Sequence, residues 1–317
     1  MLSLFVMIGW NLKKYFTKDD GCVIIIFVYI FGKLFERTER MLTMTGGIFD
    51  SHCHYDDTAF DDDRYQLLDR LLTGESHPVD KMLHAATDEK SSLFGIETAQ
   101  RYENYYTSIG FHPENVEDVP ENYMEILSQL YIKAAGIHKL SAVGEIGLDY
   151  HYEGYNKEKQ IKLFKDQVRF AVCKSLPVIV HCRDAVEDCM KILSEFRPDG
   201  VMHCFSGSAE TAREVVELGM YIGFTGALAF KNNKKSRRAC EVVPLERLLL
   251  ETDCPYMAPP PYRGERSDSS MIIETAKVMA EIKGVSVEKV LQVTNENACR
   301  LFGINIDENA LFYSELG

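Results

Sequence analysis

Short apolar runs alternate with longer amphipathic stretches from about residue 47 to residue 305 of this 317-residue chain. The stretch 161–173 carries Ile161, Phe164, Val168 and Val172 at helical spacing, so these side chains are expected to share one buried face. Similar helices are expected at 211–218 and 272–282. The apolar runs have the length of strands and lie at 47–51, 82–86, 105–110, 140–144, 177–180, 200–202, 220–224 and 248–251.

Strands that alternate with helices predict an α/β fold with parallel pairing. Eight such strands over ~260 residues fit a closed (β/α)8 barrel, the TIM barrel, better than an open sheet. An open doubly wound sheet more often has a glycine-rich phosphate loop after its first strand, and none follows residues 47–51 here.

The first 46 residues differ from the rest. Their longest apolar run, 22–31, is about half the ~20 residues that a membrane span requires, and it lacks the flanking features of a signal peptide. We therefore expect no membrane association and three segments: an N-terminal extension at 1–46 outside the functional fold, the barrel at 47–305 and a tail at 306–317. We hypothesise that the functional protein starts near Met41 or Met44.

Composition narrows the class of protein. A hydrophobic content of 46% supports a large core, and a net charge of -13 argues against non-specific nucleic-acid binding through a basic face. It does not exclude an enzyme that holds phosphates in a local cleft. Nine scattered cysteines are typical of a reduced, cytoplasmic protein. Cys53, Cys182, Cys204 and Cys254 are expected to be small apolar side chains rather than ligands.

Polar side chains follow most of the expected strands. Active sites of such barrels lie at the carboxyl ends of the strands, so these side chains are expected to converge. His52 and His54 are two residues apart and therefore point to one side of an extended strand. The candidate ligands are His52, His54, Glu145, His181, His203 and Asp253.

Each candidate has a simpler explanation. His181 alone could be a hydrogen-bonded core histidine, Glu145 could cap a loop, and Asp253 before Cys254-Pro255 could start a turn or helix. All six would need such explanations at equivalent barrel positions, which favours a metal site. Other histidines lie off this pattern and are treated as ordinary polar residues: His77, His84, His138 and His151.

Six ligands exceed the needs of one four-coordinate ion, so we expect two divalent ions, Mg²⁺, Mn²⁺ or Zn²⁺, with Glu145 shared. A water held between two cations loses a proton readily, and Asp253 is the expected general base. The first ion would be held by His52, His54, Glu145 and Asp253. The second would be held by Glu145, His181 and His203.

Substrate contacts are expected from cations near this site. Arg183 follows His181 by two residues, Arg263 lies in a Pro/Gly-rich loop with Arg266, and Lys231 begins a basic segment that ends at residue 238. Loops after strands 7 and 8 often hold phosphates in such barrels, although a charge run can equally be a solvated face. His112 either contacts substrate or closes a turn.

With these residues in view, the chain resembles the TatD family of metal-dependent deoxyribonucleases, which have barrels of the metal-dependent hydrolase type. The resemblance runs from about residue 48 to about residue 304. It implies two divalent ions on the same six ligands and hydrolysis of DNA at single strands or 3′ ends, commonly as a 3′→5′ exonuclease linked to repair or degradation. Cys182 and Cys254 stand where the family more often has serine. The motifs are FDSHCH (49–54), GFHPE (110–114), VGEIGLDY (143–150), PVIVHCRDA (177–185), MHCFSGS (202–208), GFTGALAFKN (223–232), LLLETDCPYMAPPPYRGER (248–266) and TNENACRLFGI (294–304).

Two alternatives remain open. The same centre could hydrolyse a small phosphoester, a lactone or an amide, because two cations also polarise carbonyl groups. A barrel that only binds or scaffolds is the other alternative, but its ligand set would be expected to be broken, and here it is intact. No stable protein partner is implied.

Overall fold

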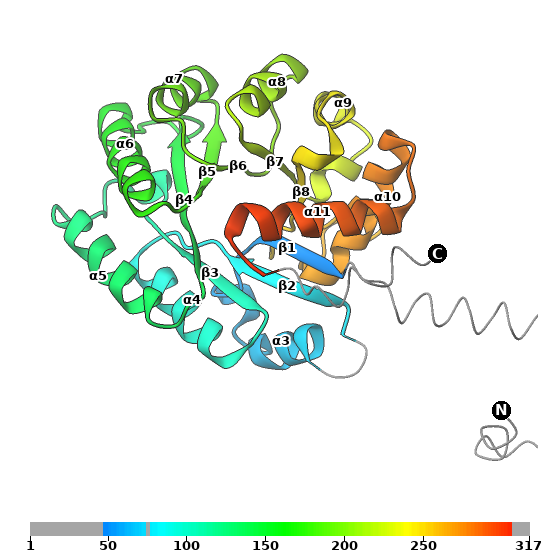
Figure 1. The fold of residues 1–317 in the computed structure, drawn as a ribbon, viewed down its shortest axis with the longest axis horizontal. Coiled ribbons are helices and arrows are strands. Elements are labelled where there is room, and N and C mark those ends of the chain that lie inside the picture. The colour runs from blue at the N-terminus through cyan, green and yellow to red at the C-terminus, as the bar shows by residue number, and fades with distance from the viewer. Residues whose placement is uncertain (1–46, 74–76, 306–317) are drawn as a thin grey trace, which may run out of the picture. The chain divides into compact units, whose positions relative to one another are not determined.

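The computed structural model describes residues 47–73 and 77–305, in which eight parallel strands lie side by side in sequence order and form a nearly closed barrel (Figure 1). This confirms the predicted (β/α)8 architecture. The strands are β1 (Ile48–Cys53), β2 (Val79–His84), β3 (Tyr105–Ile109), β4 (Leu140–Asp149), β5 (Val178–Arg183), β6 (Gly200–Met202), β7 (Tyr221–Phe224) and β8 (Leu248–Leu250).

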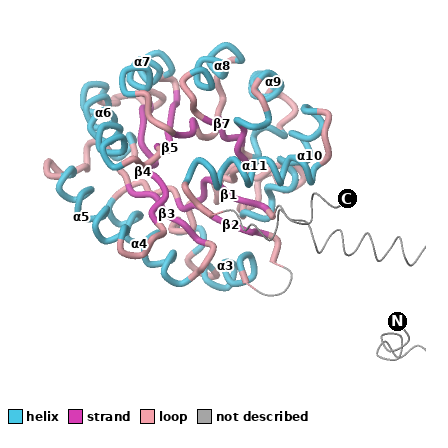
Figure 2. The backbone as a smooth tube through the Cα atoms, in the orientation of Figure 1, coloured by secondary structure: helices cyan, strands magenta, loops and turns pink. Residues whose placement is uncertain are grey.

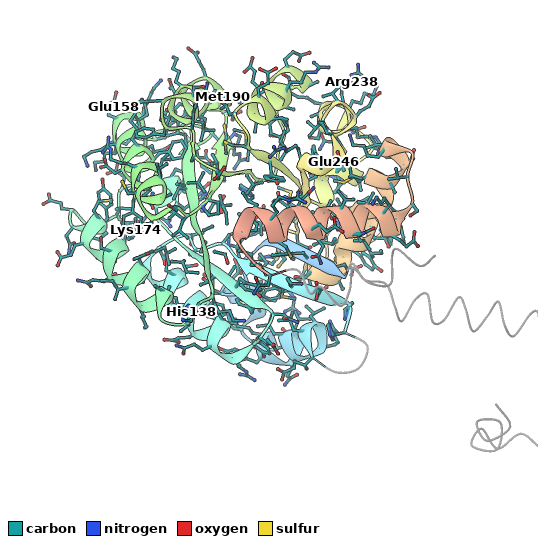
Figure 3. The ribbon with its side chains drawn as sticks, viewed as in Figure 1. His138, Glu158, Lys174, Met190, Arg238 and Glu246 are labelled. Atoms are coloured by element: carbon teal, nitrogen blue, oxygen red, sulfur yellow. The ribbon has the colours of Figure 1, made fainter. Side chains whose placement is uncertain are left out.

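Helices surround the strands, and Figure 2 shows the strands as an inner ring within them. The labelled side chains of Glu158, Met190 and Arg238 lie on this outer layer (Figure 3). The helices are α3 (Arg64–Leu72), α4 (Glu89–Arg101), α5 (Tyr123–Ala135), α6 (Lys157–Lys174), α7 (Val186–Phe196), α8 (Ala209–Glu217), α9 (Lys234–Val242), α10 (Ile272–Lys283) and α11 (Val287–Phe302). Short 3-10 helices are η2 (Thr58–Phe60), η3 (Pro113–Asn115), η4 (Gly226–Ala229), η5 (Leu245–Arg247) and η6 (Ser269–Met271).

The predicted segment boundaries stay predictions. Residues 1–46, with the apolar run 22–31 and the hypothesised starts Met41 and Met44, lie outside the described residues, as does the tail 306–317. Within the described ranges, no helix is both long and apolar enough to cross a membrane.

Three strands extend further than the apolar pattern predicted, and the first of them, β1, continues two residues past its predicted end, to Cys53. β4 continues five residues past the predicted end at residue 144, to Asp149, and β5 continues to Arg183. The apolar pattern ends early because the inner surface at the carboxyl ends of the strands carries polar side chains. Glu145 and His181 therefore lie within strands, where the ladder hydrogen bonds hold their backbones in place.

The amino-terminal end of the barrel is closed by α11, which lies across the ring of strands in Figure 1. Its residues Ala298, Cys299 and Phe302 pack against one buried side chain from seven of the strands. This apolar packing leaves the opposite, carboxyl-terminal end for polar side chains. The strand residues of the cluster are Phe49, Leu83, Ala142, Ile179, Val201, Tyr221 and Leu249.

The first and last strands are joined by the protein itself. The Asp253 amide donates to the His52 carbonyl at 3.0 Å, and the His54 amide donates to the Cys254 carbonyl at 3.0 Å. The buried Asp50 carboxylate accepts the Thr252 hydroxyl at 2.6 Å. Closure between β1 and the end of β8 thus has hydrogen bonds that need no ion.

The buried face of α6 differs from the predicted face at one end. Phe164 and Val168 are buried as predicted, but Val172 is 45% exposed, so the prediction for Val172 was wrong. The face is instead centred nearer Ala171 and includes two buried glutamines. A pattern of apolar residues does not reveal buried polar positions, so the predicted buried face of α6 included Val172 and missed the glutamines.

These glutamines attach α6 to the ends of two strands. Gln160 accepts from the Asp149 amide at 2.9 Å and donates to its carbonyl at 2.8 Å. Gln167 accepts from the Phe111 amide at 2.8 Å and donates to its carbonyl at 3.0 Å. Each side-chain amide thereby satisfies two buried backbone groups beside the carboxyl ends of β3 and β4.

Replacing Gln167 with leucine is expected to lower the free energy of unfolding by about 2–4 kcal/mol, because the amide and carbonyl of Phe111 both lose their partner. Urea denaturation measures this. The matched control is Gln129→Leu on the exposed face of α5, which should change stability by no more than about 0.5 kcal/mol. Equal effects of the two substitutions would contradict the assignment.

Candidate metal centre

The Glu145 carboxylate lies at the middle of the carboxyl-terminal end and contacts histidines on two sides. Its Oε2 is 3.2 Å from His52 Nε2 and 3.6 Å from His54 Nε2. Its Oε1 is 2.8 Å from His181 Nδ1 and 2.7 Å from His203 Nε2. The two oxygens of one carboxylate therefore face two separate sets of imidazoles.

Asp253 completes the first set. Its Oδ1 is 3.3 Å from His54 Nε2 and 3.7 Å from His52 Nε2. Its backbone has φ of 60°, in the left-handed region, three residues after the end of β8. This sharp change of direction turns the side chain toward β1, and the hydrogen bond from the Asp253 backbone amide to the His52 carbonyl fixes its position.

The His52 and His54 side chains converge as the spacing predicted. Their Nε2 atoms are 3.0 Å apart, and the intervening Cys53 is buried in the core behind the strand. The register of β1 against β2 shifts between Asp50 and Cys53, which marks a bulge that re-aims the end of the strand. The His52 ring also stacks on His203 at 3.9 Å, so the two sets of imidazoles are in contact.

His112 belongs to the same cluster. Its Nε2 is 3.4 Å from Glu145 Oε1, while its Nδ1 accepts the Glu114 amide at 3.2 Å and starts the short helix η3. The two alternatives from the sequence were a substrate contact and a turn. The structure shows the turn, and it also places the ring against the shared carboxylate.

The other predicted substrate contacts form no hydrogen bond or ion pair with the residues of this cluster among the described residues. Arg183 is exposed, with its guanidinium 5.2 Å from the centre of the Tyr152 ring, and Arg263 lies 4.7 Å from the centre of the Phe230 ring. Lys231 is exposed. Within the described ranges, none of these three cations forms an ion pair.

Part of the predicted basic region has structural partners. Arg237 pairs with Glu281, and Arg238 pairs with Glu241 on the surface of α9. Arg266 binds the Asp63 carboxylate through both terminal nitrogens at 2.7 Å. These arginines therefore fit the solvated-face alternative rather than a phosphate site.

Two carboxylates behind the cluster were not predicted. Asp149 Oδ2 is 2.9 Å from His181 Nε2, and the buried Glu251 carboxylate is 3.9 Å from His203 Nδ1. The spacing of Asp149 was a usable signal, because residues four apart on one strand point to the same side. Glu251 fits only because Gly223 has no side chain: a Cβ there would lie 2.2 Å from Glu251 Oε2.

The four histidines that the sequence analysis treated as ordinary polar residues lie outside the cluster. His77, His138 and His151 are exposed. His84 is fully buried; its Nε2 lies 3.1 Å from the Ser91 carbonyl, while its Nδ1 has no hydrogen-bond partner among the described residues.

The negative charge of the buried carboxylates in this cluster is balanced by protons on neighbouring histidines. Burial would raise the pKa of Glu145, but the neighbouring His203 and His112 hold it well below its ordinary value. Burial also opposes protonation of His54 and His181. Their carboxylate partners nevertheless raise the pKa of His54 to about 9 and that of His181 to about 10. For His52, burial and then the charge of His203 lower the pKa to about 3.

These residues fit divalent cations. Three groups of three ligand atoms each lie within 4.8 Å of one another: His52, His54 and Glu145; His52, His203 and Glu251; and His112, Glu145 and His181. Imidazole and carboxylate ligands suit Zn²⁺ and Mn²⁺. In the absence of a cation the carboxylates are balanced by imidazolium protons, which a cation would replace.

Metal binding at pH 7.5 is expected to release about two protons, because His54 and His181 are protonated in the metal-free protein and must lose a proton to coordinate. Affinity should therefore rise with pH until both imidazoles are neutral, at about pH 10. Calorimetric titration with Mn²⁺ in buffers of different ionisation enthalpy measures the release, with the exposed His138→Gln as control. An enthalpy independent of the buffer would contradict it.

Comparison with known proteins agrees with this geometry. A model of the TatD related DNase family matches residues 49–303. The uncharacterized metal-dependent hydrolase YabD of Bacillus subtilis is 37% identical over 262 residues, which cover 81% of this chain and 100% of YabD. The 3′-5′ ssDNA/RNA exonuclease TatD of Cronobacter sakazakii is 31% identical over 263 residues, which cover 80% of this chain and 97% of that protein.

A solved structure agrees as well. The crystal structure of YJJV, a TatD homologue from Escherichia coli K12, superposes with a TM-score of 0.75 at 30% identity and covers 81% of this chain and 98% of its own. The similarity thus spans the whole barrel from β1 to α11, including every strand that contributes to the cluster. On these grounds the chain belongs to the TatD family of metal-dependent hydrolases.

Proposed function

We propose that this chain is a divalent-metal nuclease that removes nucleotides from the 3′ end of single-stranded DNA. The observation that carries the proposal is the Glu145 carboxylate, whose two oxygens face two separate sets of imidazoles. In this proposal the six predicted ligands hold two ions, with His112 beside the second. Two metal sites that share a carboxylate suit phosphodiester hydrolysis, because both the attacking and the leaving oxygen need stabilisation.

The residues of the chain have distinct roles in this proposal. Bound divalent ions supply Lewis acidity and make a water molecule a better nucleophile at neutral pH. Glu145 fixes the separation of the two ligand sets, and Asp253 accepts the proton of the attacking water. Asp149 orients the His181 ring from behind, as carboxylate partners of ligand histidines do, while Glu251 lies 3.9 Å behind His203 without a hydrogen bond to it.

A nucleic-acid substrate is supported by two observations. The relative from Cronobacter sakazakii is named for exonuclease activity on single-stranded DNA and RNA. Arg183, Lys231 and Arg263 are exposed cations without an ion pair among the described residues; Arg183 ends β5, Lys231 follows β7 and Arg263 follows β8. A few unpaired cations beside a metal centre can attract phosphates even on a chain with a net charge of -13.

The test is a single-stranded oligonucleotide labelled at its 5′ end and incubated with Mg²⁺, Mn²⁺ or Zn²⁺. The expected result is a ladder of labelled products that shorten from the 3′ end, blocked when the last 3′ linkages are phosphorothioates. Absence of cleavage with every metal, together with hydrolysis of a lactone, an amide or a small phosphoester, would replace this proposal with the alternative substrate class.

The cellular setting is also a proposal. None of the eight cysteines in the described part of the chain forms a disulfide, as expected in a reducing compartment such as the cytoplasm. The proposed reaction uses residues of one chain and needs no protein partner.

A further inference from the structure

Exposed aromatic side chains gather in two loops at the carboxyl-terminal end of the barrel. Tyr152 is 56% exposed in the loop after β4, and Tyr256 is 57% exposed in the loop after β8. Each is three residues beyond an acidic residue of the centre, Asp149 or Asp253. Each of these loops therefore presents one large exposed ring at the end of the barrel that carries the candidate ligands.

Tyr256 is fixed beside the first set of ligands. Its amide donates to the Asp253 carbonyl at 2.9 Å, and its hydroxyl donates to the Asp57 carboxylate at 2.9 Å. Asp57 is itself bound through its amide to the His54 carbonyl at 3.1 Å. The hydrogen bonds of its hydroxyl and amide fix the position of the Tyr256 ring, and more than half of the side chain stays exposed where the loops after β1 and β8 meet.

Tyr152 is fixed beside the second set. Asp149, three residues earlier, contacts His181 and accepts the His151 amide at 2.8 Å. Arg183 donates to the Tyr152 hydroxyl at 3.3 Å, with its guanidinium 5.2 Å from the ring centre. The ring therefore lies beside a cation at the border between the β4 and β5 loops.

The two tyrosines lie on opposite sides of the centre. β4 and β8 are separated by three strands in each direction around an eight-stranded barrel, and Figure 1 shows them across the ring from each other. Glu145 lies between them, with one oxygen toward the ligands nearer Tyr256 and the other toward the ligands nearer Tyr152. A phosphate held by divalent ions on the two ligand sets that Glu145 faces would thus have one tyrosine on each side.

The surroundings distinguish nucleobases from other apolar ligands. The two rings are separated by a polar centre, and each is bonded to a charged residue, Asp57 or Arg183, so they do not form the continuous apolar patch that a protein or membrane partner requires. A polynucleotide, in contrast, alternates flat bases with phosphates. Unpaired bases stack on aromatic side chains whatever their sequence, whereas paired bases are hidden in the duplex.

We propose that Tyr256 and Tyr152 are base-stacking subsites on the two sides of the scissile phosphate, so that the substrate class is a strand with unpaired bases at its end. This inference rests on the proposed nuclease function. It accounts for a single-strand preference through this chain's own residues, because a base must leave its partner before it can reach either ring.

The test couples each tyrosine to one base of the substrate. Oligonucleotides carry a single abasic residue on the 5′ or the 3′ side of the scissile bond. Affinity is measured by fluorescence anisotropy in chelator, where no cleavage occurs, and KM and kcat are measured with metal. The variants are Tyr256→Leu and Tyr152→Leu, and the Phe substitutions keep the ring while removing the hydroxyl.

The matched control is Tyr65→Leu, an exposed tyrosine on α3 whose ring lies 4.3 Å from Arg101 at the end of α4. That helix end precedes the start of β3 and therefore lies at the opposite end of the barrel. This variant should behave as the wild type.

We expect one abasic position to weaken binding and raise KM by about 5- to 150-fold for the wild type and the Phe variants. The Leu variant of the matching tyrosine should show the same loss on the intact strand and no further loss on the abasic one. Equal KM for intact and abasic strands in the wild type would overturn the inference while leaving the nuclease function in place. No cleavage of any strand would instead reject the nuclease function.

Discussion

Replacing Glu145 with glutamine is expected to lower kcat by about 10³-fold or more and to reduce the number of bound divalent ions. Glutamine has the same shape but no negative charge, and this one carboxylate faces both sets of imidazoles. Loss of its charge weakens both proposed sites at once, and the stabilisation that a metal pair supplies is worth several kcal/mol in the transition state. Oligonucleotide cleavage gives kcat, and atomic absorption after dialysis gives the metal content.

The control for charge removal is Glu246→Gln. Glu246 is exposed in η5, directly before the start of β8, and is labelled in Figure 3. It lies at the end of the barrel opposite to the centre, so activity and metal content should stay at wild-type values. Full metal content in Glu145→Gln would contradict a shared ligand, even if its activity were low.

Replacing Asp253 with asparagine is expected to lower kcat by about 10²–10⁴-fold, the usual contribution of a general base. Asparagine keeps the shape and tolerates the left-handed backbone at this position, where φ is 60°. The hydrogen bond from the Asp253 backbone amide to the His52 carbonyl is also retained, because it does not involve the side chain. The substitution therefore separates the chemistry from the fold, and circular dichroism should show an unchanged thermal transition in chelator.

The control for this substitution is Asp199→Asn, because Asp199 is exposed directly before β6 and so lies at the opposite end of the barrel. It should keep wild-type kcat. The general-base role also predicts that kcat falls more than metal affinity in Asp253→Asn. If activity survived at a wild-type rate, another group would have to accept the proton.

The contacts between the first and last strands bear on how much metal removal should destabilise the barrel. The ion that the sequence analysis places on His52, His54, Glu145 and Asp253 would also link the end of β1 to the loop after β8. The structure shows backbone bonds and the buried Asp50 carboxylate between the same two segments. Metal should therefore add stability through binding to the native state alone, about 2.7 kcal/mol at a hundredfold excess over Kd, without being required for closure.

Much of the centre was predictable from local pattern. Each of His52, His181 and His203 follows or ends an apolar run, and in a parallel barrel all such positions lie at one end. The structure brings these side chains together with Glu145 and Asp253. Their role as metal ligands stays a prediction, which the two substitutions above test.

Other contacts had no local pattern to reveal them. Gln160 and Gln167 are polar residues on the buried face of α6, so an apolar stripe could not include them, and Val172 was misplaced for that reason. Glu251 depends on Gly223, which lies on a neighbouring strand. Such residues are recognised only when the strands that carry them are seen side by side.

The sequence by itself determined the eightfold alternation of strands and helices, and hence the barrel and the end at which polar side chains meet. It did so because periodicity is local and is written in consecutive residues. Tertiary structure decided that the two oxygens of Glu145 face different imidazoles, that His112 joins them, and that the loops carrying Tyr152 and Tyr256 follow strands on opposite sides of the barrel. These facts depend on distances between residues from different strands, which are set by how the barrel closes rather than by any one segment.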